Sequence, residues 1–290
     1  MTWPQEIDRM ELSNGRSMTL CALHQLVTCG KCCLDFSLNN SDDEHTADED
    51  LGVAPNVVIE IPEKTKHSGT VFPSRFGQRK RKLMSLVEFF PASSCVRVRP
   101  NVKRFMNRYD SFECPIYTDG ACFDNGAADA RSCCGIFFKL TYFSDQSGSV
   151  AFTLEDRDPD GKVYRHTSNR AELRAVIAAL RYRVWQSEGF RNVVIATDST
   201  YVVHGATVWA PAWIRKGWHL STGEPVKNRD LWESLLLEAE KLHDSGMTMH
   251  FWRIPQEWNH EADSAAKDAA ENDPPVDKFV HAIGIGTRFM

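Results

Sequence analysis

The sequence has no long hydrophobic run, and this absence limits where the protein can act. No segment approaches the roughly 18–20 apolar residues of a membrane-spanning helix, and the first residues contain no apolar stretch of the signal-peptide type. We therefore expect an intracellular protein, in the nucleus or the cytoplasm, with no membrane partner.

Two common catalytic patterns are missing as well. The sequence offers no nucleophilic serine–histidine pair and no glycine-rich loop that would cradle a phosphate. It also lacks an excess of positive charge, because the formal net charge is −5. As an average, this charge argues against a nucleic-acid-binding protein, but the charges are unevenly distributed along the chain.

The nine cysteines are an odd number, and in a reducing compartment we expect free thiols rather than a disulfide framework. Four residues near the N-terminus nevertheless have spacings that thiolate and imidazole ligands of zinc can adopt. They are Cys21, His24, Cys29 and Cys32. The gap between His24 and Cys29 is unusually short for such a site. Structural zinc and ordinary thiols both stay open.

The chain of 290 residues is longer than one ordinary domain, and its 42% hydrophobic and 25% charged residues suffice for a core. We expect four parts: a partly disordered N-terminal segment of unknown role, a basic linker, a catalytic domain and a C-terminal tail. Their expected boundaries are 1–62, 63–112, 113–273 and 274–290.

Charge changes sign between the first two parts. Residues 41–50 form an acidic, low-complexity run that has little to bury, and we expect it to be mobile. From Lys64 to Arg108, twelve lysines and arginines accompany a single acid, Glu88. This segment is suited to attracting phosphates, and Arg79–Lys82 is suited to nuclear import. A solvated linker explains the same residues nearly as well.

From Glu113 onward, dense hydrophobic periodicity predicts regular structure. An apolar stripe at helical spacing runs from Leu173 to Val184, and short β-branched runs with turn residues between them indicate strands. The expected strands cover residues 115–118, 134–140, 149–154, 193–197 and 247–254. The expected helices cover residues 169–186, 199–207, 231–242 and 261–271.

This order predicts an α/β fold. Three consecutive strands with short turns indicate an antiparallel meander, and right-handed crossovers place the fourth and fifth strands parallel to the first. We expect a mixed five-stranded sheet, three strands antiparallel plus two parallel, flanked by helices and preceded by a poorly structured extension. Sites in such sheets form at the carboxyl ends of parallel strands, where Asp119 and Asp198 stand.

Four acids are candidates for one site: Asp119, Glu172, Asp198 and Asp263. Each has a simple structural alternative. Asp119 fits a turn, and Glu172 fits a capping box. Asp198 fits an N-cap, and Asp263 fits a solvated helix face. A fold that gathers all four at one sheet edge makes these alternatives improbable together. Carboxylates are hard ligands for Mg²⁺ or Mn²⁺, so the pattern predicts metal-assisted phosphodiester hydrolysis.

The order of these motifs resembles the ribonuclease H family, type 1, over about residues 113–272. The resemblance is carried by residues 117–122 with Asn125-Gly126, and by residues 167–173, 197–199, 217–218, 225–232 and 259–263. It implies a ribonuclease H-like fold and endonucleolytic cleavage of the RNA strand of an RNA–DNA hybrid. Two Mg²⁺ ions, replaceable by Mn²⁺, would be held by the four catalytic acids. We expect a monomer, with any partner of the N-terminal segment unknown.

The resemblance also implies a set of substrate contacts, in three groups. The first faces the RNA strand, the second grips a DNA phosphate, and the third packs against deoxyribose and rejects a 2′-hydroxyl. In that order they are Cys122, Asn125 and Asn169; Arg165, Thr167 and Asn228; and Trp209, Trp213 and Ser221. Core packing is the structural alternative for the two tryptophans. Arg215 and Lys216 are expected to add phosphate attraction.

One segment departs from the family pattern. Many members carry a histidine in a flexible, glycine-rich loop before the last helix, whereas Pro255–Asn259 contains neither residue type. This connection resembles the compact loop of the plant and archaeal branch, and it leaves the identity of the general acid open.

Two alternative functions are considered: a hybrid-binding module with little or no activity, and a 3′–5′ exonuclease on the same fold. The four acids argue against the first, and the hybrid contacts argue against the second.

Overall fold

The computed structural model describes residues 65–77, 85–95, 102–125, 127, 129–139 and 148–280, with four short strands nearer the N-terminus. Those strands are β1 (Ile7–Glu11), β2 (Ser17–Cys21), β3 (Thr28–Cys29) and β4 (Leu34–Asp35), paired antiparallel as β1–β2 and β3–β4. The zinc hypothesis for Cys21, His24, Cys29 and Cys32 lies outside the described side chains. Residues 65–284 form a compact unit of their own.

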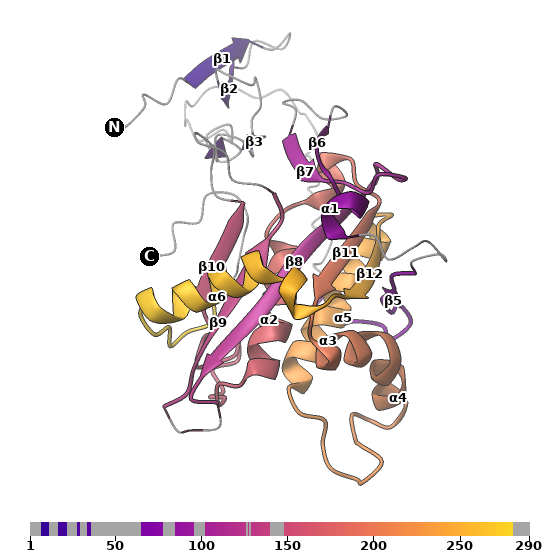
Figure 1. The fold of residues 1–290 in the computed structure, drawn as a ribbon, viewed down its shortest axis with the longest axis vertical. Helices are drawn as coiled ribbons and strands as arrows, with labels where there is room; N and C mark the ends of the chain where they lie inside the picture. The colour runs from indigo at the N-terminus through magenta and orange to yellow at the C-terminus, as the bar shows by residue number, and fades with distance from the viewer. Residues whose placement is uncertain are drawn as a thin grey trace, which may run out of the picture. The chain divides into compact units, whose positions relative to one another are not determined.

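A mixed sheet of six strands organises this unit (Figure 1), in the order β10–β9–β8–β11–β12–β5. The strands are β5 (Ser74–Arg75), β8 (Glu113–Phe123), β9 (Arg131–Phe137), β10 (Ser149–Thr153), β11 (Asn192–Thr197) and β12 (Thr248–Arg253). The antiparallel meander β8–β9–β10 is confirmed, as is the parallel pairing of β8 with β11 and of β11 with β12. The predicted strand count of five is wrong by one, because β5 adds a parallel edge beside β12.

The four predicted helices occur in the predicted order with shifted ends, and α4 between the second and third was not predicted. They are α2 (Ser168–Arg181), α3 (Thr200–His204), α4 (Ala210–Arg215), α5 (Arg229–Asp244) and α6 (His260–Asn272). Short helical turns link them: η2 (Trp185–Glu188), the π-helical η3 (Gly205–Trp209) and η4 (Gln256–Trp258). No helix within the described residues is both long and apolar enough to cross a membrane.

The sheet has a core on each face, because successive strand residues point to opposite sides. In β11, Val193 and Ile195 join the larger core with α2 and α5, whereas Val194 and Ala196 join a second core. Helix α6 lies across the second face, in front of the strands in Figure 1. The rest of that face is covered by residues that precede β8.

The prediction of a basic linker over residues 63–112 is wrong for the described residues of that segment. It forms β5, α1 (Leu86–Phe89), and a hairpin of β6 (Ala92–Cys95) and β7 (Val102–Phe105). Apolar side chains spaced between the basic ones pack on the second face, as Phe90, 1% exposed, illustrates. We call residues 65–112 the extension.

Two further expectations concern the tail and the thiols. Residues 274–280 are not a separate tail, because Val280 accepts a hydrogen bond from the buried Arg174 guanidinium and donates one to Glu155. Among the cysteines whose side chains the structure describes, Cys114, Cys122, Cys133 and Cys134 are free thiols, as predicted.

Candidate active site

Asp119 lies within β8 rather than at its end. The strand continues to Phe123 and pairs Asp119 with Gly135 of β9. Pairing with β11 stops at Tyr117, so Asp119 lies just past the stretch that the two parallel strands share. The residue is 9% exposed, and its Oδ1 accepts a hydrogen bond of 2.9 Å from the Gly120 amide. The turn alternative for Asp119 is therefore wrong.

Glu172 belongs to the second turn of α2. The helix is capped by Thr167, whose hydroxyl accepts a hydrogen bond from the Arg170 amide, so Glu172 is not a capping residue. A close approach to β8 brings Glu172 toward Asp119. A Cβ atom on Gly120 would lie 2.3 Å from the Glu172 nitrogen, so only glycine lets the strand and helix meet here.

Asp198 occupies the connection from β11 to α3. The N-cap of α3 is Ser199, whose Oγ accepts a hydrogen bond of 3.2 Å from the Val202 amide. Asp198 therefore does not have the capping role that its position suggested. Its Oδ1 instead accepts a hydrogen bond of 3.0 Å from the side-chain amide of Asn259.

Asp263 lies in the first turn of α6. Gly135 of β9 allows this helix to approach the sheet, because a Cβ atom there would lie 2.1 Å from the Ala262 carbonyl oxygen. The Asp263 Oδ2 atom pairs with the Lys267 ammonium at 2.7 Å, one helical turn away. Both side chains are partly exposed, so this pair contributes little to stability.

The four acids act on one another electrostatically. Burial, together with the nearby charges of Asp198 and Asp263, raises the pKa of Asp119 to about 7. Burial also raises the pKa of Glu172 to about 8. A hydrogen bond from Ser199 lowers this pKa, and the charges of Asp119 and Asp198 raise it further. Carboxyl groups from four separate elements are therefore brought together at this point.

The donor set fits divalent cations. Glu172 Oε2 is buried and has no hydrogen-bond partner among the described residues, so one strong acceptor of Glu172 is unsatisfied. The other donors are carboxylate oxygens, which suit Mg²⁺ or Mn²⁺. No three acidic, histidine or cysteine side chains in the described ranges already stand at metal-binding spacing. The cations themselves would therefore have to draw the carboxylates inward.

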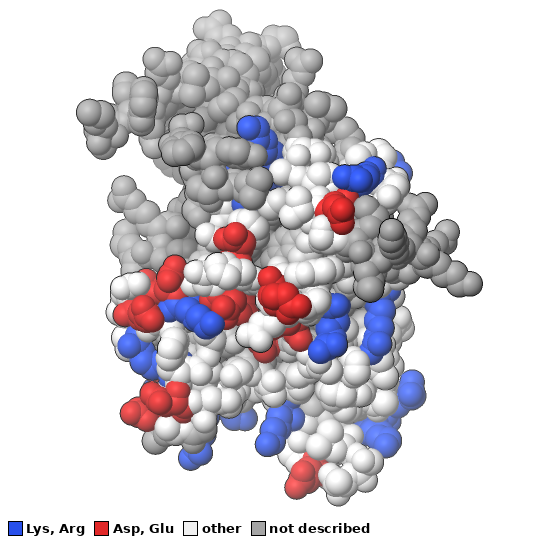
Figure 2. Space-filling model, viewed as in Figure 1, with Lys and Arg blue, Asp and Glu red and all other residues white. Residues whose placement is uncertain are grey.

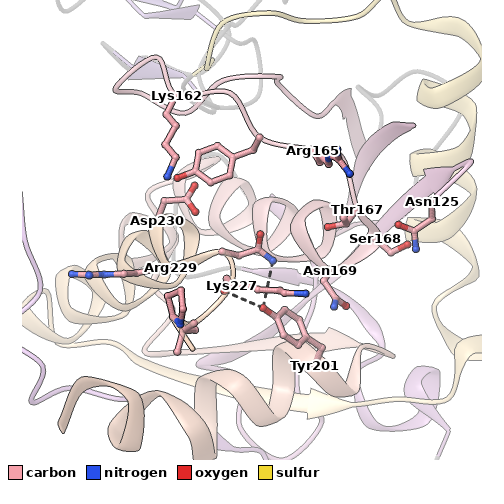
Figure 3. Close-up of a pocket in the computed structure, with 14 residues that line it drawn as sticks. Asn125, Lys162, Arg165, Thr167, Ser168, Asn169, Tyr201, Lys227, Arg229 and Asp230 are labelled. Atoms are coloured by element: carbon pink, nitrogen blue, oxygen red, sulfur yellow. Dashed lines mark hydrogen bonds between the residues drawn. The ribbon is translucent and has the colours of Figure 1, made fainter. Parts of the chain in front are cut away.

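An open cavity of about 780 Å³ begins at the N-terminus of α2 (Figure 3). Five of the predicted contacts line it together: Asn125, Arg165, Thr167, Asn169 and Asn228. Asn228 has a left-handed backbone, with φ of 56°, at the start of α5. Its amide nitrogen donates to the Tyr201 hydroxyl at 3.4 Å.

A second cavity of about 590 Å³ adjoins the first, and Tyr201, Val226 and Lys227 line both. It contains the other predicted group: Trp209, Trp213 and Ser221. Trp213 is also part of the larger core, at 9% exposure, whereas Trp209 is 36% exposed. Trp213 therefore both packs in the core and lines the cavity.

Three predicted contacts remain, and only Lys216 of them lines a cavity. Cys122 is in β8, and its thiol contacts Asn125 Oδ1 at 3.8 Å. Lys216 lines the second cavity, and Arg215 lines neither. The four acids line neither cavity. Asn169 links the two regions, because it lies three residues before Glu172 on α2.

Comparison with known proteins gives the family. The RNase H family model matches residues 113–271, more than half of the chain. The ribonuclease H of Cyanothece sp. is 42% identical over 120 residues, which are 41% of this chain and 66% of that protein. The ribonuclease H of Treponema pallidum is 35% identical over 127 residues, which are 44% and 73%. A solved structure, RNase H1 from the halophilic archaeon Halobacterium salinarum, is 21% identical with a TM-score of 0.36, covering 55% of this chain and 98% of that chain.

The chain belongs to the ribonuclease H family. It is a ribonuclease H, a nuclease and phosphodiester hydrolase, and enzymes of this family hydrolyse the RNA strand of RNA–DNA hybrids.

Sequence reasoning missed several side chains of this ribonuclease H. Lys162, Tyr164, Lys227 and Arg229 line the first cavity with the predicted residues (Figure 3). A single lysine, tyrosine or arginine carries no positional signal of its own, so only the fold shows that these residues, including Arg229 at the start of α5, line the cavity. Asn259 was also missed, although it stands directly before a helix that contains one of the acids.

Proposed function

We propose that this ribonuclease H cuts the RNA strand of RNA–DNA hybrids internally, using two Mg²⁺ ions held by Asp119, Glu172, Asp198 and Asp263. The observation that carries the proposal is the crowding of buried and half-buried carboxyl groups, among them Glu172 with its unsatisfied Oε2 atom. Carboxylates so placed repel one another unless protons or cations neutralise them. At neutral pH, divalent cations are the more effective partners.

When bound, the ions supply an activated water and stabilise the leaving oxygen during in-line displacement at phosphorus. The protein's part is to hold the ligands from separate elements. The β8 backbone fixes Asp119 through the Gly120 amide, and the Asn259 amide fixes Asp198. Glu172 Oε2 accepts no hydrogen bond within the described part of the chain and is therefore free to bind a cation. Mn²⁺ has the same ligand preference and is expected to substitute.

The two adjoining cavities suit the two strands of a hybrid. In the first, Asn125 and Asn169 can exchange hydrogen bonds with 2′-hydroxyls of RNA, while Arg165, Thr167 and Asn228 can grip a DNA phosphate. In the second, the indole faces of Trp209 and Trp213 would pack against deoxyribose, beside Ser221. Cys122 would contribute its backbone near the RNA strand.

The turn before α6 supplies no proton donor of the kind many family members use. Residues 255–259 contain no histidine, and His260 is the exposed first residue of α6. We therefore assign the general acid to none of these residues. The proposal further comprises a monomer that acts in the nucleus or the cytoplasm, in which the N-terminal segment has a separate partner or none.

A substrate panel tests the proposal. Labelled RNA–DNA hybrid, double-stranded RNA and double-stranded DNA of one sequence are incubated with the full chain in Mg²⁺, and again in EDTA. The expected result is Mg²⁺-dependent cuts inside the RNA of the hybrid alone. Stepwise shortening from a 3′ end would favour an exonuclease. Binding of the hybrid without cuts would favour an inactive module, and either outcome overturns the proposal.

A further inference from the structure

Asn259 ties several parts of the metal site together. Its side-chain amide nitrogen donates one hydrogen bond to Asp198 Oδ1 and another to the Thr118 carbonyl oxygen, each of 3.0 Å. Its backbone carbonyl oxygen accepts a hydrogen bond of 3.0 Å from the Asp263 amide nitrogen. Asn259 is 1% exposed; its hydrogen bond to Thr118 is buried, and that to Asp198 is partly buried. One residue therefore touches Asp198, the strand that bears Asp119, and the helix that bears Asp263.

Asn259 is in turn positioned by a short turn. Within it, the Trp258 amide donates to the Pro255 carbonyl at 3.0 Å, and the Asn259 amide donates to the Gln256 carbonyl at 2.9 Å. These bonds fix the shape of the turn but not its place on the domain. The Trp258 ring supplies that anchor, because it packs edge-on against Trp252 of β12 at a centroid distance of 6.4 Å.

The extension completes this anchor. Three phenylalanines of the extension surround the Trp252 ring. The distances from its centroid to theirs are 5.3 Å for Phe76, 5.9 Å for Phe89 and 5.8 Å for Phe90. These rings also contact one another. They form one cluster, with Trp258 packed against it. We call Phe76, Phe89, Phe90, Trp252 and Trp258 the aromatic cluster.

A groove shows how near α1 comes to the turn. Leu86 and Phe90 of the extension line a groove of about 320 Å³ together with Trp258 and Asn259. Helix α1 lies near the β12 end of the sheet in Figure 1, where the turn to α6 begins. The extension therefore reaches Asn259, which contacts Asp198 and Asp263.

We propose that the extension positions the metal centre, through the aromatic cluster and Asn259. This inference rests on the proposed function, because it takes the four acids to be the metal ligands. If the cluster loosens, the turn moves more freely, and Asn259 holds Asp198 and Asp263 in register for less of the time. The cations would then bind more weakly, although every ligand is present. Groups that orient metal ligands commonly change metal affinity or activity by about 10- to 100-fold.

Magnesium binding to the full chain, measured by calorimetry in the absence of nucleic acid, tests the inference. Asn259→Ala removes both donated hydrogen bonds and should weaken Mg²⁺ binding by about tenfold. Phe76→Leu leaves every ligand and Asn259 unchanged and should weaken it by about threefold. In the double variant, affinity should equal that of Asn259→Ala alone, because both changes act through the same contact.

Phe72→Leu is the matched control. Phe72 also belongs to the extension and is partly buried, but it packs against the core on the opposite face of the sheet. It should bind Mg²⁺ like the wild type. Hybrid cleavage gives a second measure: for Phe76→Leu, saturating Mg²⁺ should restore the rate, whereas a general loss of structure would lower it at every concentration.

The outcomes separate the two proposals. If the wild-type chain binds no Mg²⁺, the proposed metal site itself is wrong. If the wild type binds Mg²⁺ and Phe76→Leu binds it equally well, the site stands and the role of the extension is wrong. Additive losses in the double variant would also contradict the proposed route through Asn259. Asn259→Ala also weakens the fold, so the milder Phe76→Leu carries the decisive comparison.

Discussion

At the scale of single residues, the site is set up by carboxyl groups that are unfavourably placed when no cation is present. Asp119 and Glu172 are largely buried, and each lies in the field of other acids. Two glycines make this crowding feasible, because Gly120 admits α2 and Gly135 admits α6 to within contact of the strands. Larger residues at either position would push α2 or α6, and the acid that it carries, away from the sheet.

The raised pKa values give a prediction for the metal-free protein. The pKa of Asp119 rises from 3.8 to about 7 and that of Glu172 from 4.5 to about 8, so both groups bind protons more tightly when folded. Their contribution to stability is present below about pH 4 and is lost as pH rises through about 7–8. In EDTA, the urea concentration at the unfolding midpoint should therefore decrease as the pH rises from about 5 to about 8.5.

Added Mg²⁺ should reverse this fall above about pH 7, because cations bind the deprotonated acids of the folded state. Asp119→Asn is the matched control, since the amide keeps the shape but does not titrate. It should flatten the pH dependence in EDTA. An unchanged urea midpoint across this range in the wild type would show that the two acids are not crowded as described.

The four acids could be found in the sequence because each stands in a short motif with its own residue order. The structure differs from the prediction in where these acids lie in the secondary structure. Asp119, for example, lies inside β8 instead of at its end. Asn259 stands in the same motif as Asp263, but its role could not be found there. Its importance comes from a partly buried hydrogen bond to Asp198, 61 positions away in the sequence, and no local pattern encodes such a contact.

At the scale of secondary-structure elements, the extension is the largest difference between expectation and structure. Its helix α1 has four residues, too few to show helical periodicity, and its strands are equally short. A local signal did exist, because Ser85 and Glu88 form a capping box that starts α1. The density of lysine and arginine obscured it, since charged segments are commonly solvated.

Truncation tests whether the extension belongs to the catalytic domain. A chain that starts at residue 65 should unfold at the same temperature as the full chain, because residues 65–284 form a compact unit. A chain that starts at residue 113 loses Phe89, Phe90 and Phe105, and it exposes Tyr117 and Trp252. Its thermal midpoint should fall by at least about 10 °C, because each buried aromatic contributes about 3–5 kcal/mol.

Equal thermal midpoints for the two truncated chains would contradict this account and favour the prediction that residues 63–112 are a linker. The shorter chain also lacks Arg104 of β7, whose buried guanidinium pairs with Glu188 at 2.7 Å in the full chain. Without Arg104, Glu188 keeps its longer pair of 3.3 Å with Arg183, so the buried carboxylate is less well neutralised and the expected destabilisation increases.

At the scale of the whole molecule, charge is arranged for a polyanionic substrate despite the net value of −5. Figure 2 shows acidic side chains gathered over α6, with basic side chains beside and below them. Lysines and arginines also line the first cavity, at Lys162, Arg165, Lys227 and Arg229. Cations at the acids and basic groups in the cavities would together offset the repulsion of phosphates.

The most direct measurement is cleavage of one labelled hybrid by the wild-type chain and by Asp198→Asn, side by side in Mg²⁺. The amide matches the carboxylate in size but cannot balance the charge of a cation, so the variant should fold normally. We predict internal cuts in the RNA strand by the wild type and none by the variant, with equal thermal midpoints in EDTA. Undiminished cleavage by Asp198→Asn would remove Asp198 from the site and contradict the four-acid metal centre.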